Sequence, residues 1–563
     1  MNRPLFLARL AGTQEQMGAQ HGRLTADAAG RLLAFYRTMP ERTLAGGMGG
    51  AARLVARRLA GAWQARLARE RPPELAARTR AFVEAVAAGA PGYDAGEALR
   101  TFAVMDSLQN CVSLVGRARL GPFASPLAAR VAAGAVPACS TLIAWGRATE
   151  DGELLFARNF DFPGVGVWDA APAFVVCAPD AGQRYGFFTT RGADAPVVTA
   201  VNEAGLVIAP HTRFHRGVTW GGAMIVDLVH DLARRAESLA DAIAIAHERP
   251  ASSSWGVAIG SARERAGAVL ELAGRTIEVV RPAAGAELLT CANRYRTPAL
   301  QDGELRGSAA WAIHSARREQ RLRALAAAHG GPLGPRDLAR FLGDRRDPAA
   351  PARVRRFGAI LASPVNVHAV VVAPARRRAH LGIDRAPVCE GAWAELAWEW
   401  SGPAGGWELG ATEGSGFTAE RREAFVAPHD AATVQVRDAV CAWEGSHDVP
   451  AARASIGRAI ELAPEDPSLR LAAAWLALDA GAIEPAIDHV RAGLALETEP
   501  YRRGQLLLWG ARAAGARDPA LARRWRDELD RLAGDGVDEL RATAARRRRG
   551  ARAHPNLMLV DAY

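Results

Sequence analysis

The sequence predicts an α+β fold over roughly its first 430 residues and a helical repeat after that, in a chain of 563 residues. Between about residues 139 and 281, short apolar runs of β type surround two amphipathic helical stretches, which is typical of layered sheets and helices. After about residue 435, several residue types recur at intervals close to 34, the period of a helix-pair repeat. A chain of this length can bury a large core and form more than one domain.

The N-terminal part is predicted to be mainly helical. Residues 3–10 form a short candidate strand, and residues 23–120 are rich in Ala, Leu and Arg with apolar residues three and four apart. Residues 121–137 are rich in Gly, Pro and Ala, which is typical of an exposed linker. The first twenty residues lack the basic and long apolar regions of a signal peptide, because Gln14–Gln16 interrupt them.

The central part alternates between strands and helices in an order that fits an α+β domain. Strand-type runs lie at residues 173–178, 185–189, 197–201, 206–209, 255–260, 268–272 and 276–280. Helical runs lie at residues 222–234, 238–248 and 309–342. A strand pair at 360–373 and 378–382 is expected to close the domain, and a variable stretch follows to about residue 430.

Residues 435–535 are predicted to form two to three helix-pair repeats. Three residue types recur there at spacings of 34 or 35: Pro450, Pro485 and Pro519; Ala452, Ala486 and Ala520; Trp475 and Trp509. A 34-residue helical period is that of the tetratricopeptide repeat, which forms a small solenoid able to bind a protein partner. An Ala-rich helical cap with a chance spacing is the alternative. Residues 536–563 are predicted to be a basic tail.

Composition argues against several function classes. The net charge of +10 comes entirely from arginine, since the chain contains no lysine. The one concentrated basic run, Arg546–Arg549, lies near the C-terminus, so we interpret the charge as a solvated face and expect no nucleic-acid partner. The six cysteines are widely spaced, and neither a metal site nor a cofactor is predicted. With no apolar run of membrane-spanning length, we expect a soluble, cytoplasmic protein.

Cys139 is the strongest candidate for a catalytic residue. It begins an apolar run of strand type, residues 149–152 form a turn, and a second run leads to Arg158-Asn159-Phe160-Asp161. A β-hairpin would bring Cys139 near Arg158 and Asp161. A thiol becomes a good nucleophile as the thiolate, and a nearby guanidinium lowers its pKa. A small buried apolar side chain is the alternative for a lone cysteine.

This stretch resembles the cysteine-type N-terminal nucleophile (Ntn) hydrolases, most of all the peptidase C45 family of acyl-CoA:6-aminopenicillanic acid acyltransferase-like proteins. The shared pattern is the cysteine, a hairpin with Asp-Gly at its turn, and Arg-Asn-x-Asp. The resemblance, which runs from about residue 4 to 397, implies a four-layer αββα sandwich. It also implies self-cleavage between Ala138 and Cys139, so that residues 1–138 form a pro-region that completes a catalytic domain of residues 139–430.

The same resemblance implies roles for the residues of the motif. Cys139 would attack an acyl carbon while its freed α-amine, with a reference pKa near 8, acts as the base. Arg158 would stabilise the thiolate, and Asp161 would bind the α-amine. Asn293 would donate its side-chain amide to the oxyanion, although a turn-capping asparagine is the alternative for that residue.

Three further residues are implied as substrate or oxyanion contacts. Thr212 stands where choloylglycine-type relatives have asparagine, and its backbone N–H could donate to the oxyanion. His211 is expected to face the substrate. Arg318, in a Ser-x-x-Arg pattern that begins at Ser315, is expected to order the site, with Ser315 capping a helix.

The resemblance implies amide hydrolysis or acyl transfer through a cysteine thioester, on a small acyl amide or an acyl-CoA-type substrate. A non-catalytic interaction protein, with the repeats as its working part, is a second hypothesis. A papain-like hydrolase using Cys139 and His211 is a third, but Cys139 begins a strand and not a helix. The change of composition near residue 430 further predicts that residues 1–430 can cleave themselves without the repeats.

Overall fold

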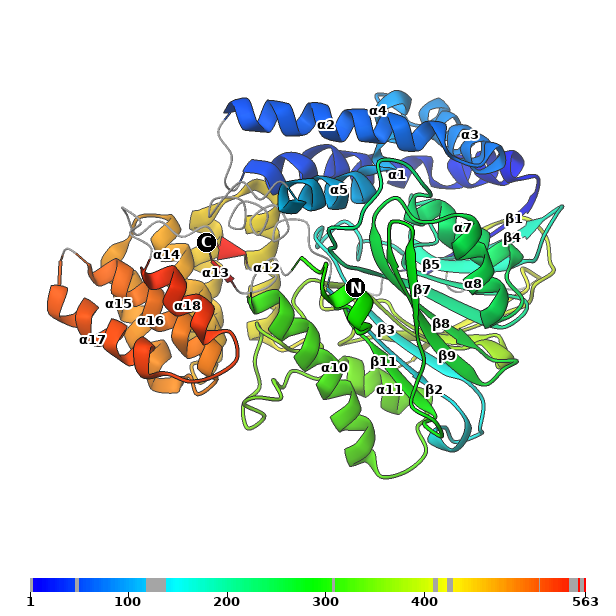
Figure 1. Ribbon diagram of the computed structural model, residues 1–563. Helices are drawn as coiled ribbons and strands as arrows, with labels where there is room; N and C mark the ends of the chain where they lie inside the picture. The colour runs from blue at the N-terminus through cyan, green and yellow to red at the C-terminus, as the bar shows by residue number, and fades with distance from the viewer. Residues whose placement is uncertain are drawn as a thin grey trace.

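Two β-sheets packed face to face form the centre of the larger part of the molecule, on the right in Figure 1. The computed structural model describes residues 4–45, 50–117, 138–305, 309–408, 414–422, 429–515, 517–545, 555–556 and 561–562. The linker predicted at residues 121–137 and the arginine run at 546–549 lie outside these residues.

The first sheet has nine strands in the order β10-β9-β8-β7-β6-β5-β4-β1-β15. They are β1 (Phe6–Gly12), β4 (Pro172–Pro179), β5 (Tyr185–Thr190), β6 (Thr199–Asn202), β7 (Leu206–Thr212), β8 (Ser254–Ser261), β9 (Ala266–Ala273), β10 (Thr276–Val280) and β15 (Gly405–Glu408). Neighbours pair antiparallel except β1 and β4, which pair in parallel. Side chains alternate between two cores, so that Val175 packs on one face of β4 and Phe174 on the other.

The second sheet has seven strands in the order β11-β2-β3-β12-β13-β14-β16. They are β2 (Ala138–Ala144), β3 (Leu155–Asp161), β11 (Leu288–Cys291), β12 (Asn366–Ala373), β13 (Arg378–Gly382), β14 (Trp393–Trp398) and β16 (Phe417–Arg422). All of its neighbouring strands pair antiparallel. Cys139 therefore lies near the start of β2, a strand with neighbours on both sides.

Helices cover the outer faces of the two sheets, which gives four layers. Helices α7 (Ile225–Arg235) and α8 (Leu239–Glu248) pack on the nine-stranded sheet, and α10 (Ala309–His329) and α11 (Pro335–Leu342) pack on the seven-stranded one. Buried side chains of both sheets meet in the inner core, among them Ile143, Phe156, Phe174 and Val207. The predicted αββα sandwich is confirmed.

The N-terminal helices lie together over one end of the sandwich (Figure 1). They are α1 (Gln14–Ala45), α2 (Gly50–Arg69), α3 (Pro73–Gly89), α4 (Ala95–Thr101) and α5 (Val104–Arg117). Arg78 of α3 and His21 of α1 both bind the carboxylate of Asp194, which follows β5, at 2.6 and 2.9 Å. All three side chains are buried, so this contact fixes the N-terminal helices to the nine-stranded sheet.

The C-terminal part consists of consecutive helices that pack on their neighbours in the chain, beside α10 and the N-terminal helices (Figure 1). They are α12 (Ala431–Ser446), α13 (Val449–Leu462), α14 (Pro467–Asp479), α15 (Ile483–Leu496), α16 (Pro500–Ala514), α17 (Pro519–Arg531) and α18 (Val537–Ala545). Pro450, Pro485 and Pro519 lie in the first turns of α13, α15 and α17, where a missing N–H costs no hydrogen bond. Three helix pairs therefore underlie the recurrence of about 34 residues.

The structure corrects four boundaries. Helix α18 packs on α16, so residues 537–545 of the predicted tail belong to the helical part, and β17 (Pro555–Asn556) pairs with β18 (Asp561–Ala562). The stretch after residue 382 contains β14, β15 and β16, so the strand pair does not close the domain. The helix predicted at 309–342 is two helices separated around Gly330-Gly331, and the strand predicted from residue 360 begins at Asn366.

Within the described residues, no helix has the length and apolar character needed to span a membrane.

Candidate active site

The β2–β3 hairpin places the three residues of the motif together, as predicted. Its register sets Ala138 opposite Asp161, Cys139 opposite Phe160, and Thr141 opposite Arg158. The turn includes Gly152, whose φ of +73° is a conformation that a residue with a Cβ adopts only with strain. The hairpin is therefore a local consequence of two apolar runs and a glycine turn.

The Cys139 sulfur lies against the guanidinium of Arg158. Nη2 of Arg158 donates to Sγ at 3.5 Å, and the cysteine is 1% exposed. Burial raises the pKa of the Cys139 thiol, and the nearby Arg158 opposes this only in part. In the uncleaved chain the sulfur therefore carries its proton.

Arg158 is held by the backbone of the other sheet. Its Nη1 donates to the carbonyl of Val198, just before β6, and its Nη2 donates to the carbonyl of Pro210 in β7. These contacts cross from the seven-stranded sheet to the nine-stranded one. The guanidinium is thus fixed beside the sulfur by both sheets of the sandwich.

The backbone of Cys139 is held on both sides by side chains from distant elements. Its N–H donates to Oδ1 of Asn293 at 2.9 Å, and its carbonyl accepts from Nη1 of Arg318 at 2.7 Å. Nη2 of Arg318 also donates to the same Asn293 oxygen at 2.9 Å. Asn293, which follows β11, thus binds the peptide group before the Cα of Cys139, and Arg318 of α10 binds the peptide group after it.

Asn293 is oriented differently from the expectation for an oxyanion donor. Its oxygen faces Cys139, and its Nδ2 donates to the carbonyl of Thr212 at 3.1 Å. Its backbone N–H donates to Oγ of Ser315 at 2.9 Å. Ser315 lies inside α10 and orients Asn293, so the expectation that it caps a helix is wrong. Asn293 is 0% exposed, so its amide is a buried part of the site.

Asp161 has one satisfied and one unsatisfied oxygen. Oδ1 accepts from Nδ2 of Asn366, in β12, at 2.8 Å. Oδ2 has no hydrogen-bond partner among the described residues, although Asp161 is fully buried. Burial raises the pKa of Asp161 to about 7. The arrangement leaves a free acceptor beside Cys139.

Among the described contacts, the ring of His211 makes no hydrogen bond to the Cys139 sulfur. Its Nε2 lies 2.9 Å from Oγ1 of Thr141, and burial, followed by the charge of Arg158, holds its pKa well below the usual value. A neutral histidine bonded to a threonine does not form the Cys/His pair that a papain-like hydrolase needs. The role of His211 toward a substrate stays a prediction.

Sequence reasoning missed two features of the site. Asn366 binds Asp161 but is 205 residues away in the chain, and no local pattern distinguishes it. A mainly apolar cavity of about 100 Å³ lies between the N-terminal helices and the sandwich. Its lining includes Leu32, Trp168 and Ala193, which belong to the same buried apolar cluster as Cys139. The ring of Trp168 contacts that of Phe160, 5.9 Å between centroids, and Phe160 lies opposite Cys139.

Comparison with known proteins supports the family resemblance. Residues 147–384 match the family model for acyl-coenzyme A:6-aminopenicillanic acid acyl-transferase, so the similarity to that family is confirmed over this stretch. The matched stretch includes Arg158, Asp161 and Asn293, and it begins after Cys139. The similarity is to acyl-transferring enzymes.

Two solved structures are similar over less than half of this chain. One is the N-acylethanolamine-hydrolyzing acid amidase ortholog of Caenorhabditis elegans, at 12% identity over 42% of this chain and 93% of that chain, with a TM-score of 0.30. The other is a mutant of the conjugated bile acid hydrolase of Clostridium perfringens, at 14% identity over 43% and 88%, with a TM-score of 0.28. TM-scores this low support no conclusion about the fold or the function of this chain. The comparison with curated proteins found no match.

Proposed function

We propose that this chain is an Ntn-type cysteine enzyme that cleaves its own Ala138–Cys139 bond and then hydrolyses or transfers the acyl group of a small acyl amide or acyl thioester. The observation that supports this best is the way residue 139 is held. Its sulfur, N–H and carbonyl each contact a different buried side chain, those of Arg158, Asn293 and Arg318. A cysteine that only packs in a core needs none of these contacts.

The first reaction is an N-to-S acyl shift. Sγ of Cys139 attacks the carbonyl carbon of Ala138, and the thiol proton passes to the Cys139 nitrogen as the C–N bond breaks. The product is a thioester between Ala138 and Cys139 with a free α-amine. Water then adds to the thioester and releases the Ala138 carboxylate and the thiol. Asn293 already holds the nitrogen that leaves, which favours the geometry of attack.

In the cleaved enzyme the α-amine of Cys139 serves as the base. It takes the thiol proton, the Arg158 guanidinium stabilises the thiolate, and Sγ attacks the acyl carbon of the substrate. The leaving amine or thiol receives the proton, and water or an acceptor amine then attacks the thioester. Oδ2 of Asp161 is available to accept a hydrogen bond from the new α-ammonium group.

The cavity beside Trp168 is the best candidate for the acyl group. Its lining is mainly apolar, and the one carboxylate in it, Asp194, is already bound by Arg78 and His21. At about 100 Å³ it is smaller than the roughly 150 Å³ cavity that admits benzene. We therefore propose a short apolar acyl chain as the preferred substrate group.

A denaturing gel of freshly expressed protein tests the proposal. Cleavage after residue 138 of 563 in a 59.7 kDa chain gives fragments of about 15 and about 45 kDa, and the larger one should begin Cys-Ser-Thr-Leu. Cys139→Ala should stay whole and inactive on a panel of N-acyl amides and thioesters. Cys177→Ala is the matched control, because Cys177 is also buried beside an arginine, Arg78, at 3.6 Å. Wild-type protein that stays intact on incubation, or wild-type turnover by Cys139→Ala, would exclude the mechanism.

A further inference from the structure

Helix α10 contacts the nucleophile with one side and the C-terminal helices with another. Toward Cys139 it contributes Arg318, which holds the Cys139 carbonyl, and Ser315, which holds Asn293. Toward the C-terminal helices it contributes Arg317, whose Nη2 donates to Oε1 of Glu499 at 2.8 Å. Arg317 and Arg318 are consecutive residues, so the two sets of contacts share one turn of one helix.

The contact at Glu499 belongs to a row of acidic residues in equivalent positions. Asp430, Asp466 and Glu499 each stand directly before the first helix of a pair and cap it, with their carboxylates accepting backbone N–H groups of α12, α14 and α16. Each also binds an arginine of the catalytic domain. Asp430 binds Arg345 and Arg356, Asp466 binds Arg356, and Glu499 binds Arg317.

Two of the three capping acids are buried, whereas the Asp430 side chain is 46% exposed. Glu499 and Asp466 are 0% and 1% exposed, and Glu497 forms two 2.7 Å bonds with the buried Arg355. A buried carboxylate without its cation would strongly destabilise the folded chain, so these ion pairs hold the C-terminal helices against the sandwich. Of the three capping acids, only Glu499 contacts α10 in the contacts described here.

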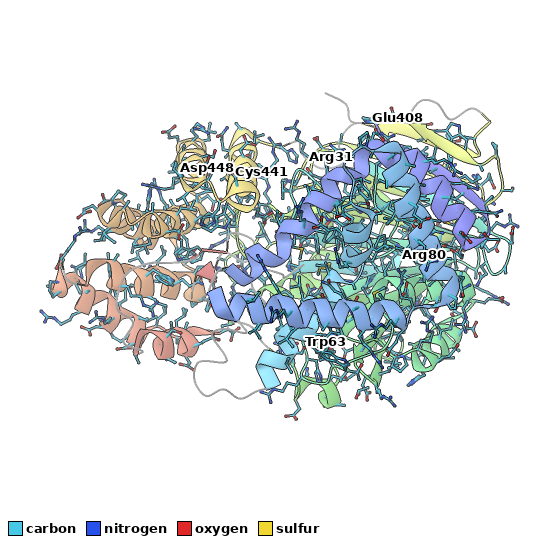
Figure 2. The ribbon with its side chains drawn as sticks, turned by 90° about the horizontal axis from the view of Figure 1, so that it is seen from above. Arg31, Trp63, Arg80, Glu408, Cys441 and Asp448 are labelled. Carbon is cyan, nitrogen blue, oxygen red and sulfur yellow. The ribbon has the colours of Figure 1, made fainter. Side chains whose placement is uncertain are left out.

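A second contact joins the C-terminal helices to the surroundings of the cavity. In α12, Glu444 accepts from the N–H of Gly164 at 3.2 Å, and Cys441 lies 3.9 Å from the Val165 carbonyl. Figure 2 shows Cys441 on the helix between the other C-terminal helices and the N-terminal ones. Residues 164 and 165 precede Trp168, which lines the cavity.

We propose that the C-terminal helical segment is part of the catalytic unit and that Glu499 is a positioning residue, which acts through Arg317 to hold Arg318 and Asn293 against Cys139. This proposal rests on the proposed function. It replaces the expectation that residues 1–430 work alone, because that truncation removes Glu499 from Arg317, Glu497 from Arg355 and Asp466 from Arg356. Arg317 would then keep its weaker contact with Asp347, at 3.4 Å, but lose the carboxylate that ties α10 to the C-terminal helices. A displacement of about 1 Å at a reacting group can cost about a hundredfold in rate, so a small shift of α10 is enough.

Glu499→Gln and its matched control Asp466→Asn test the proposal in the full chain. Both replace a buried capping carboxylate by its amide, and only Glu499 is joined to α10. Pulse-labelled cell-free synthesis gives the rate of self-cleavage, and a substrate that wild type accepts gives kcat and KM. We expect Glu499→Gln to lower the cleavage rate and kcat by about tenfold to a hundredfold, with KM nearly unchanged. Asp466→Asn should lower the melting temperature comparably but leave both rates within about twofold of wild type.

Equal losses of rate in the two variants, or no loss in Glu499→Gln, would overturn the positioning role. If Glu499→Gln does not fold, Arg317→Gln should show the same loss and Arg317→Lys should recover most of it, since lysine keeps the charge. Hydrogen exchange in a Cys139→Ala background separates the two proposals, because it needs no activity. Glu499→Gln should speed exchange in residues 138–144 and 309–329. If Glu499→Gln speeds exchange but the wild-type chain never cleaves itself, the proposed function is refuted and the positioning role of Glu499 is not. If Glu499→Gln leaves exchange unchanged, the positioning role is refuted and the proposed function is not.

Discussion

Replacing Asp161 with asparagine in the uncleavable Cys139→Ala chain should change how stability depends on pH. Burial raises the pKa of Asp161 from 3.8 to about 7, with Arg318, Asn366 and Arg158 opposing it only in part. Between these two values the folded chain keeps the proton and the unfolded chain loses it. The stability contributed by this proton is complete below about pH 4 and is lost as the pH rises through about 7.

The size of the effect follows from the two pKa values of Asp161. The folded and unfolded pKa values differ by about 3, and a difference of one in pKa corresponds to about 1.4 kcal/mol. The free energy of unfolding should therefore change by about 4 kcal/mol. The unfolding entropy of a chain of 563 residues is about 1.2 kcal/mol/K. As the pH rises from 4 to 8, the melting temperature of the asparagine form should therefore rise by about 3 °C relative to that of the aspartate form.

Scanning calorimetry of the two forms across this pH range measures the difference directly. The uncleavable background matters, because a free α-ammonium group beside Asp161 would lower its pKa in the cleaved enzyme. The exposed Asp302, replaced by asparagine in the same background, is the control for the substitution itself. A melting difference at position 161 that does not change with pH would show that Asp161 is ionised in the folded precursor, against the reasoning from burial.

Three other substitutions have expected outcomes that follow from the site. Asn293→Ala should slow self-cleavage by about a hundredfold, because the Cys139 nitrogen loses the side chain that holds it for the attack. It should also lower the melting temperature, because Arg318 and the Thr212 carbonyl lose a buried partner; a rate loss without a stability loss would contradict this. Cys139→Ser should process slowly or not at all on a time-course gel, because a hydroxyl ionises less readily than a thiol; rapid processing would count against the thiol as the required group. Ala193→Leu should reduce kcat/KM for substrates with longer acyl chains but not for acetyl substrates, and an equal reduction for both would place the acyl group elsewhere.

The parts of the site that the sequence predicted are local, and the parts that it missed join distant elements. Cys139 and Asp161 are two ends of one hairpin, so apolar runs and a glycine turn were enough to bring them together. Asn293 and Arg318 were placed by resemblance, since neither has a local pattern that requires contact with Cys139. Asn366 carries no signal because it reaches Asp161 only after β12 pairs with β3.

The docking of the C-terminal helices was missed for a compositional reason. In a chain whose basic residues are all arginine, the sequence does not distinguish an arginine that binds a buried carboxylate from one that faces solvent. The 34-residue recurrence predicted the helix pairs, but a period by itself does not indicate which residues of the repeat meet the sandwich. Acids directly before α12, α14 and α16 are the signal that could have predicted both the caps and the interface.

The burial of the site connects self-cleavage with access to the substrate. In the uncleaved chain Cys139 and Asp161 are at most 1% exposed, so no acyl substrate reaches the sulfur. Ala138 lies opposite Asp161 in the β2–β3 ladder, and Oδ2 of Asp161 is buried without a hydrogen-bond partner among the described residues. Under the proposed mechanism, one bond cleavage supplies the α-amine, releases Ala138 from the end of the strand and exposes its partner Asp161. Cleavage would therefore create the α-amine base, expose the Asp161 carboxylate that binds it, and open a path to the Cys139 sulfur in a single step. This explains why the site is both polar and buried before cleavage.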